Sequence, residues 1–180
     1  MTLAEPLPAT TLVAEAPDGT VVSGYASLWG EPDAGGDVVE RGACAASLKR
    51  LAAEGGRVRM LWQHDPGQPI GLWDEVLEDA RGLRVRGRIL PDVARGREAA
   101  ALVRSGAIDG LSIGYRTVRA TQGRDGRRRL LEIDLWEVSL VTFPMLRKAR
   151  LAAKAEGAGD PLRLLHDLTA TAREARARLR

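Results

Sequence analysis

One serine in this sequence carries the residue pattern expected of a nucleophile. Ser112 lies in the stretch Gly110-Leu111-Ser112-Ile113-Gly114, between two glycines and within a largely apolar run. Glycine adds no side-chain packing to a strand, so a pair of glycines around a serine indicates that another backbone comes close there. A peptide attacked by the Ser112 hydroxyl would need such an approach. The alternative is a small polar residue at a bulge or a barrel corner.

His64 is the candidate base for such a serine. The chain has two histidines, and the other, His166, lies near the C-terminus. Residues 58–64 alternate as a strand that ends at Asp65-Pro66-Gly67, which predicts His64 at the rim of the core. Imidazole titrates near neutral pH and can accept the proton of a serine hydroxyl. The alternative is a structural histidine on that face.

Glu137 is the third candidate, within a predicted strand over residues 130–143. Alternation places it on the same face as Leu131, Ile133 and Leu135, unless a bulge intervenes. An ionised carboxylate on an apolar face is costly unless it is paired. We therefore expect Glu137 to have a partner, which is either one of the many arginines or a histidine.

Ser112, His64 and Glu137 together have the side chains of an acyl-transfer triad. In such a triad the base removes the serine proton, and the acid orients and stabilises the imidazolium. The other hydroxyls lack paired glycines and the other acids fall at turns or on the outward face; these are Ser105, Ser139, Asp109, Glu132 and Asp134. One cysteine and two distant histidines cannot form a zinc site, and no phosphate-binding loop is visible. We expect neither a metal nor another cofactor.

Strands dominate the predicted elements around these residues. Alternation and turn residues predict strands over 11–15, 21–29, 58–64, 70–78, 83–90, 107–118 and 130–143, and helices over 42–54 and 91–106. The fold class is therefore mainly β with a few helices. From residue 145 the composition changes to Ala, Arg, Leu and Lys, and leucines recur at helical spacing. We expect one domain over 1–146 and a basic helical tail over 147–180.

The amino-acid composition limits the classes of protein to which this chain can belong. The chain has 180 residues, of which 44% are hydrophobic, and this is enough for a sizeable core. Its single cysteine, Cys44, excludes an intramolecular disulfide and favours a reducing compartment. The sequence has neither an apolar run of membrane-spanning length nor the pattern of a signal peptide, so we expect an intracellular soluble protein.

The distribution of charge suggests nucleic-acid binding as a weaker alternative to acyl transfer. The net charge of +3 arises near the C-terminus, because residues 145–180 carry nine basic and four acidic side chains. Arg84, Arg86 and Arg88 also form one basic face of a predicted strand. A nucleic-acid-binding barrel is one hypothesis for that face, but stacking aromatic residues do not accompany it.

Four sequence blocks in order resemble the prohead serine proteases of tailed bacteriophages. They are Gly24-Tyr25-Ala26-Ser27-Leu28, Leu61-Trp62-Gln63-His64-Asp65 followed by Pro69-Ile70-Gly71, Gly110-Leu111-Ser112-Ile113-Gly114-Tyr115, and Leu135-Trp136-Glu137-Val138-Ser139-Leu140-Val141-Thr142-Phe143-Pro144. The resemblance covers roughly residues 20–146. On the matching positions it implies His64 as the base, Ser112 as the nucleophile and Glu137 as the third member. The herpesvirus assembly proteases, related in fold to that family, use a second histidine there, which this core lacks.

The resemblance also implies a fold and a biological role. The expected fold is a closed, mostly antiparallel β-barrel flanked by helices, as in the herpesvirus protease. The expected activity is a serine endopeptidase that cleaves the scaffolding, N-terminal segment of the major capsid protein, and itself, inside the procapsid in the cytoplasm of a bacterial host. We expect a homodimer, with no membrane and no specific nucleic acid as partner. The competing hypothesis is a catalytically silent scaffold protein that keeps the barrel.

Overall fold

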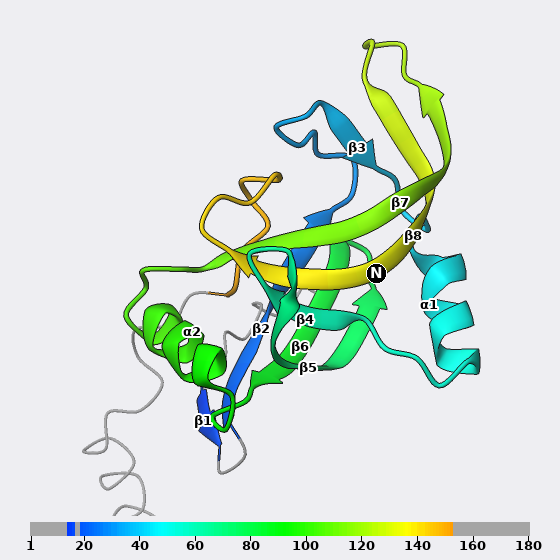
Figure 1. Cartoon of the computed structure of the whole chain (residues 1–180). Helices are drawn as coiled ribbons and strands as arrows, with labels where there is room; N and C mark the ends of the chain where they lie inside the picture. Colours follow the sequence, from blue (N-terminus) through cyan, green and yellow to red (C-terminus); the bar gives the residue numbers. More distant parts are fainter. Residues whose placement is uncertain (1–13, 17–18, 153–180) are drawn as a thin grey trace, which may run out of the picture.

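The computed structural model describes residues 14–16 and 19–152 of the chain (Figure 1). Eight strands and two helices are found there. In chain order they are β1 (Ala14–Ala16), β2 (Gly19–Leu28), β3 (Asp37–Val39), α1 (Ala45–Ala53), β4 (Arg59–Trp62), β5 (Asp65–Glu78), β6 (Gly82–Ile89), α2 (Ala94–Arg104), β7 (Gly110–Gln122) and β8 (Arg128–Val141). This content confirms the predicted mainly β class.

All described strands belong to one curled sheet with the order β1-β2-β6-β5-β4-β8-β3, and β7 pairs with β8 (Figure 1). One edge of β8 is covered by β7, and its other edge by β4 and β3. The pairings of β8 with β4 and with β3 are parallel, and the others are antiparallel. The sheet is thus mostly antiparallel, as predicted, and the two parallel pairings arise because β3 and β4 reach β8 through long connections. The described strands form a half-barrel rather than the closed barrel that was predicted.

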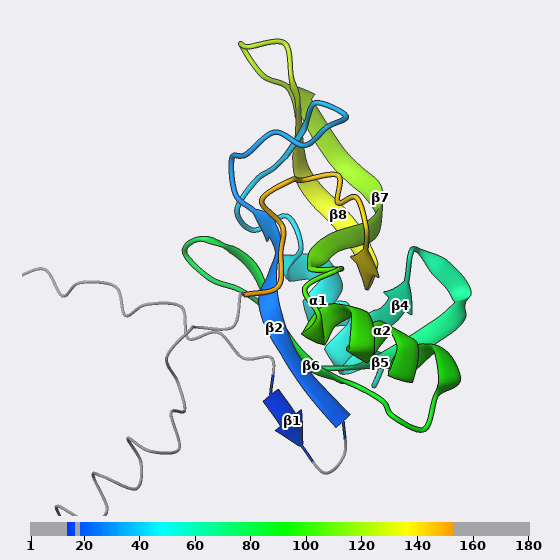
Figure 2. The ribbon, with the colours of Figure 1, turned by 90° about the vertical axis from the view of Figure 1, so that its left-hand side faces the viewer.

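The core lies between the β2-β6-β5 part of the sheet and the β7-β8 hairpin. Fully buried side chains from both parts meet there, including Val22, Ile70, Val85, Leu111 and Leu140. Helix α1 packs against β8 and β5, and α2 packs against β5 and β6. Figure 2 shows the curved sheet from the side of β1 and β2, with α2 toward the viewer and α1 behind. The sheet and the helices together shield this core from solvent, which supplies most of the driving force for folding.

Both helices form where their apolar spacing predicts. Leu48 and Leu51 of α1 pack against the core, as do Ala99 and Val103 of α2. A glycine in the left-handed region follows each helix and ends it, as at Gly106 with a φ of 74°. Among the described residues, neither helix is long and apolar enough to cross a membrane.

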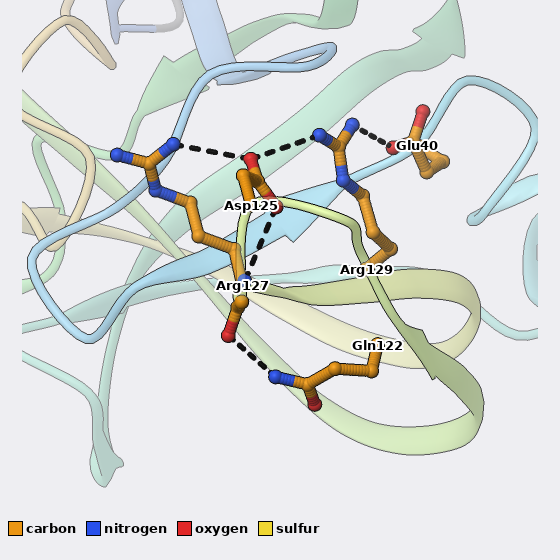
Figure 3. A network of polar contacts seen from close by, with 6 residues as sticks. Glu40, Gln122, Asp125, Arg127 and Arg129 are labelled. Carbon is orange, nitrogen blue, oxygen red and sulfur yellow. Dashed lines mark hydrogen bonds and ion pairs between the residues drawn. The ribbon is translucent and has the colours of Figure 1, made fainter.

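The far ends of β7 and β8 project as a two-stranded arm beyond the rest of the sheet (Figure 1). A polar network stabilises the turn of this arm (Figure 3). Asp125 accepts hydrogen bonds from Arg127 and Arg129, each at 3.1 Å, and Arg129 also donates to Glu40 at 2.8 Å. Glu40 directly follows β3, so the network connects the arm to the neighbouring strand. Exposed ion pairs contribute little stability individually.

The chain returns to the sheet after β8. Leu111 donates its backbone N–H to the Ala149 carbonyl at 2.9 Å, and Leu151 donates to the Asp109 carbonyl at 2.7 Å. Ala149 and Leu151 are both buried. Packed structure therefore continues through residue 151, beyond the predicted domain end at 146. The helical tail predicted over 147–180 lies almost wholly outside the described residues, so the tail and the domain boundary stay predictions.

Cys44 provides a test of this packing. Its side chain is fully buried, and this burial, together with the nearby Glu78 carboxylate, raises the pKa of the thiol to about 12. Only the thiolate reacts readily, so we expect native protein to resist iodoacetamide at pH 8. Labelling across a urea series, measured by intact-protein mass spectrometry, should follow the loss of far-ultraviolet circular dichroism. Rapid labelling of the native protein would contradict the packing of α1 described here.

Candidate active site

His64 lies in a turn directly after β4 and does not continue the strand. The φ angles of Gln63 and His64 are 52° and 62°, in the left-handed region that costs on the order of 1 kcal/mol or more for residues with a Cβ. The predicted alternation through residue 64 is therefore wrong, because the chain leaves the strand after Trp62. The turn leaves 41% of the His64 side chain exposed, so the imidazole remains accessible.

Four hydrogen bonds to β8 and the residue after it stabilise this strained turn. Gln63 donates its backbone N–H to the Leu140 carbonyl at 2.9 Å. The Gln63 side chain donates to Thr142 Oγ1 at 2.8 Å and accepts from the Thr142 N–H at 3.2 Å. The His64 N–H donates to Ser139 Oγ at 3.2 Å. These contacts offset the cost of the backbone conformation, which persists only where surrounding contacts impose it.

Glu137 lies on β8 and points away from the face that Leu135 occupies. The register pairs Gly114 with Glu137 and Tyr115 with Leu135, so Trp136 is an extra residue in a bulge. Directly paired residues share a face and consecutive residues alternate, so the bulge puts Glu137 and Leu135 on opposite faces. The predicted shared face of Glu137 and Leu135 is therefore wrong. The alternation of residue types alone cannot locate a bulge.

Both carboxylate oxygens of Glu137 have partners. The residue is 4% exposed, its Oε1 lies 2.5 Å from His64 Nδ1, and its Oε2 accepts a hydrogen bond from the Ser139 hydroxyl at 2.6 Å. The expectation of a partner is thus confirmed, and of the two alternatives the partner is the histidine. Because the acid contacts Nδ1, Nε2 is the ring nitrogen that remains for a proton transfer.

Ser139 connects the two residues. It is fully buried, donates its hydroxyl hydrogen to Glu137 and accepts the backbone N–H of His64. The sequence pattern did not mark this serine, because it lacks flanking glycines. The available signal was its spacing of two residues from Glu137, which places both side chains on one face of a strand.

Gly114 leaves the space into which the Glu137 side chain extends. A Cβ at this position would lie 2.1 Å from Glu137 Oε1 and 2.6 Å from its Cδ, far inside any normal contact. The sequence predicted a close approach of another backbone to the glycine pair around Ser112. At Gly114 the approaching group is instead the carboxylate side chain of Glu137.

Ser112 lies on the same face as these groups. The register pairs it directly with Ser139, and Gly114 with Glu137, so the four residues share one face. Directly opposed residues in such a pair have Cβ atoms about 5 Å apart. Among the described residues, no hydrogen bond of the Ser112 hydroxyl is found, either to His64 or to another group. The structure thus brings His64 and Glu137 into contact and positions Ser112 beside them.

Glu137 also changes the acid–base behaviour of His64. Its hydrogen bond, helped by its charge and opposed by partial burial, raises the pKa of His64 above 6.5. The charged pair therefore stabilises the fold fully below pH 6.5, and this contribution is lost as the pH rises through the higher folded pKa. A larger share of His64 is protonated near neutral pH than in a free imidazole.

A cavity of about 140 Å³ opens beside Ser112. Its walls come from β7, the end of β2, the segment from residue 31 to β3, and residues 145–146 after β8. Ser112 is 5% exposed and lines this cavity. The candidate nucleophile therefore faces a space that can hold part of a ligand.

The remaining candidate acids are paired elsewhere. Their partners are Arg150 for Asp109, Arg119 for Glu132, and Arg50 and Arg116 for Asp134. Within the described ranges, no group of three or more His, Cys, Asp or Glu side chains could hold a metal ion.

The basic face of β6 is largely compensated by β5. Arg84 pairs with Glu75 and Arg88 with Asp74, each at 3.1 Å. Such pairing is typical of a solvated sheet face, and it weakens the hypothesis of a nucleic-acid-binding strand.

Comparison with known proteins places these features in a family. Residues 9–160 match the family model described as caudovirus prohead serine protease. The prohead protease of Enterobacteria phage HK97 is 30% identical over 136 residues, which cover 74% of this chain and 59% of the phage protein. This chain therefore spans about three fifths of the length of that relative.

Two solved structures are also similar. The bacteriophage T4 capsid assembly protease, gp21, superposes with a TM-score of 0.57 at 18% identity, over 68% of this chain and 81% of that one. The KSHV protease in complex with a hexapeptide phosphonate inhibitor gives a TM-score of 0.45 at 13% identity, over 73% and 63%. The T4 structure shows a shared fold. Because the family model covers most of the sequence, this chain belongs to the caudovirus prohead serine protease family.

Proposed function

We propose that this protein is a serine endopeptidase in which Ser112 is the nucleophile, His64 the general base and Glu137 the acid. The observation that carries the proposal is the 2.5 Å contact between His64 Nδ1 and Glu137 Oε1, on the sheet face that Ser112 shares. A histidine oriented by a carboxylate at Nδ1 needs only a nearby hydroxyl at Nε2 to form a triad. Membership of a serine protease family supports the same roles.

In the proposed reaction, His64 Nε2 takes the proton of the Ser112 hydroxyl while Oγ attacks the carbonyl carbon of a peptide bond. The C–N bond breaks as His64 returns this proton to the leaving amine, and an acyl ester remains on Ser112. Water, deprotonated by His64, then hydrolyses the ester and restores the serine. Glu137 stabilises the imidazolium in both halves of the reaction. The mechanism requires no metal or cofactor.

The proposed substrate is the scaffolding, N-terminal segment of the major capsid protein, together with the enzyme itself. Two relatives support this: the HK97 protein is named a prohead protease, and the T4 protein a capsid assembly protease. The reaction would take place inside the procapsid, in the cytoplasm of the bacterial host, with the protease as a homodimer. The proposed catalytic domain is residues 1–146 together with the packed segment through residue 151, and the rest of the predicted tail over 147–180 is proposed as an appendage.

A catalytically silent scaffold protein would gain nothing from this arrangement. The left-handed turn at Gln63 and His64 and the burial of Glu137 both cost stability. Both features orient an accessible imidazole. They therefore favour the enzyme over the scaffold.

Substitution of the proposed nucleophile tests the activity directly. Ser112→Ala should lower cleavage by about 10³-fold or more, because no other group can form the acyl ester. The measurement is co-expression of the full chain with the capsid protein encoded beside it, followed by mass spectrometry of the capsid N-terminus. Ser105→Ala, at an exposed serine after α2, is the matched control and should cleave normally. Unchanged cleavage by Ser112→Ala would refute the proposal.

The pH dependence tests the role of Glu137. Because Glu137 raises the pKa of His64, the ring should titrate above 6.5 in the native protein, and Glu137→Gln should lower that value. NMR of the histidine ring protons measures this without a substrate, since the chain has two histidines. The acidic limb of kcat/KM should move in the same direction. An identical His64 titration in both proteins would contradict the role of Glu137.

Gly114 tests whether the position of the carboxylate matters. Gly114→Ala puts a methyl group where Glu137 Oε1 lies, so we expect a large loss of kcat/KM and a lower His64 pKa. In a Glu137→Ala background the space is free, and the same change should have little further effect on activity or on the free energy of unfolding. A double-mutant cycle measures this coupling. Additive losses would show that Gly114 acts independently of Glu137.

A further inference from the structure

The cavity beside Ser112 lies along an edge of β7 that no strand covers in the described part of the chain. β8 pairs with one edge of β7. On the other edge Leu111 donates its N–H to Ala149, and alternation puts the backbone groups of Ile113 and Tyr115 on this same edge. Ile113 and Tyr115 both line the cavity. An extended peptide can therefore pair with this edge and pass Ser112.

The walls of the cavity combine apolar and acidic side chains. Ala26, Val39 and Leu146 provide apolar surface, and Glu31, Asp33 and Asp37 provide carboxylates; no described Lys, Arg or His side chain lines the cavity. Such a cavity suits a side chain with an aliphatic stem and a cationic end.

The three carboxylates differ in how they are compensated. Glu31 pairs with Lys148 at 2.8 Å, and Asp37 pairs with Arg128. Asp33 Oδ1 accepts only the backbone N–H groups of Gly35 at 2.8 Å and Asp37 at 2.9 Å. Among the residues that the structure describes, Asp33 forms no direct ion pair, although the Arg128 guanidinium that pairs with Asp37 also interacts with its charge. The negative charge of Asp33 is therefore only partly compensated.

A second observation marks this cavity as a binding site. Ser112 lines it and is 95% buried, and no hydrogen bond of its hydroxyl is found in the described structure. Among the described residues no fully buried side-chain oxygen or nitrogen lacks a partner, so the Ser112 hydroxyl reaches the surface of the cavity. The acidic wall and the proposed nucleophile thus belong to one continuous space.

We propose that this cavity binds a lysine or arginine side chain of the substrate, with Asp33 as the residue that determines this specificity. The aliphatic stem would pack on the apolar wall, and the charged end would contact Asp33. The relation of this side chain to the cleaved bond rests on the proposed function, but the binding preference does not.

The first experiment measures cleavage preference. The full chain is incubated with a proteome-derived peptide library, and new peptide ends are identified by mass spectrometry. We expect lysine or arginine to be enriched at one position beside the cleaved bond. Asp33→Asn keeps an oxygen for the two backbone hydrogen bonds and removes the charge, so the preference should fall at least tenfold. Asp92→Asn, an exposed acid outside the cavity, is the matched control.

The second experiment measures binding without catalysis. Benzamidine and its neutral analogue benzamide are titrated into the full chain and followed by backbone amide NMR. Benzamidine should shift the signals of residues 33–37 and 111–115, benzamide should not, and Asp33→Asn should weaken benzamidine at least tenfold. Equal binding of the two compounds, or no effect of Asp33→Asn, would overturn the proposal.

The two experiments separate the two proposals. If the protein binds benzamidine selectively but cleaves no peptide, the proposed binding site for a basic side chain stands and the proposed protease activity is contradicted. If the Asp33→Asn variant cleaves peptides with the same preference for lysine or arginine, the protease proposal stands and the role of Asp33 is overturned.

Discussion

Glu137 carries a carboxylate into a part of the sheet where only 4% of the residue is exposed, and the surrounding features compensate for that burial. His64 Nδ1 and the Ser139 hydroxyl each contact one of its oxygens, and Gly114 leaves the space in which it lies. A buried charge without such partners would destabilise the fold. The need to satisfy one carboxylate therefore determines the position of the imidazole as well.

Strand β8 brings these groups together from distant parts of the chain. Antiparallel pairing with β7 places Ser112 opposite Ser139, and parallel pairing with β4 carries the chain to the turn at His64. The bonds of Gln63 to Leu140 and Thr142 then hold that turn. Because β8 is hydrogen-bonded on both edges, the site rests on the interior of the sheet rather than on mobile loops.

The two sides of Ser112 have different physical characters. On the side of β8 the polar groups are mutually hydrogen-bonded and tightly packed. On the free edge of β7 a cavity with apolar and acidic walls remains open. A packed polar side beside an open cavity is the arrangement that the proposed peptidase activity requires, since reacting groups must be preorganised while the substrate must enter.

Local sequence determined the mainly β class, both helices, the β5-β6 and β7-β8 hairpins and the identities of His64, Ser112 and Glu137 as candidates, because alternation, helical spacing and turn residues are local properties. Tertiary structure decided what local patterns cannot express. The bulge at Trp136 put Glu137 and Ser139 on the face opposite to that of Leu135, and contacts with β8 imposed the left-handed turn at His64. The parallel pairing of β4 with β8 also depends on strands that are distant in sequence, and so do the hydrogen bonds of Ser139 to Glu137 and His64. The register of these strands is set by packing of the whole sheet.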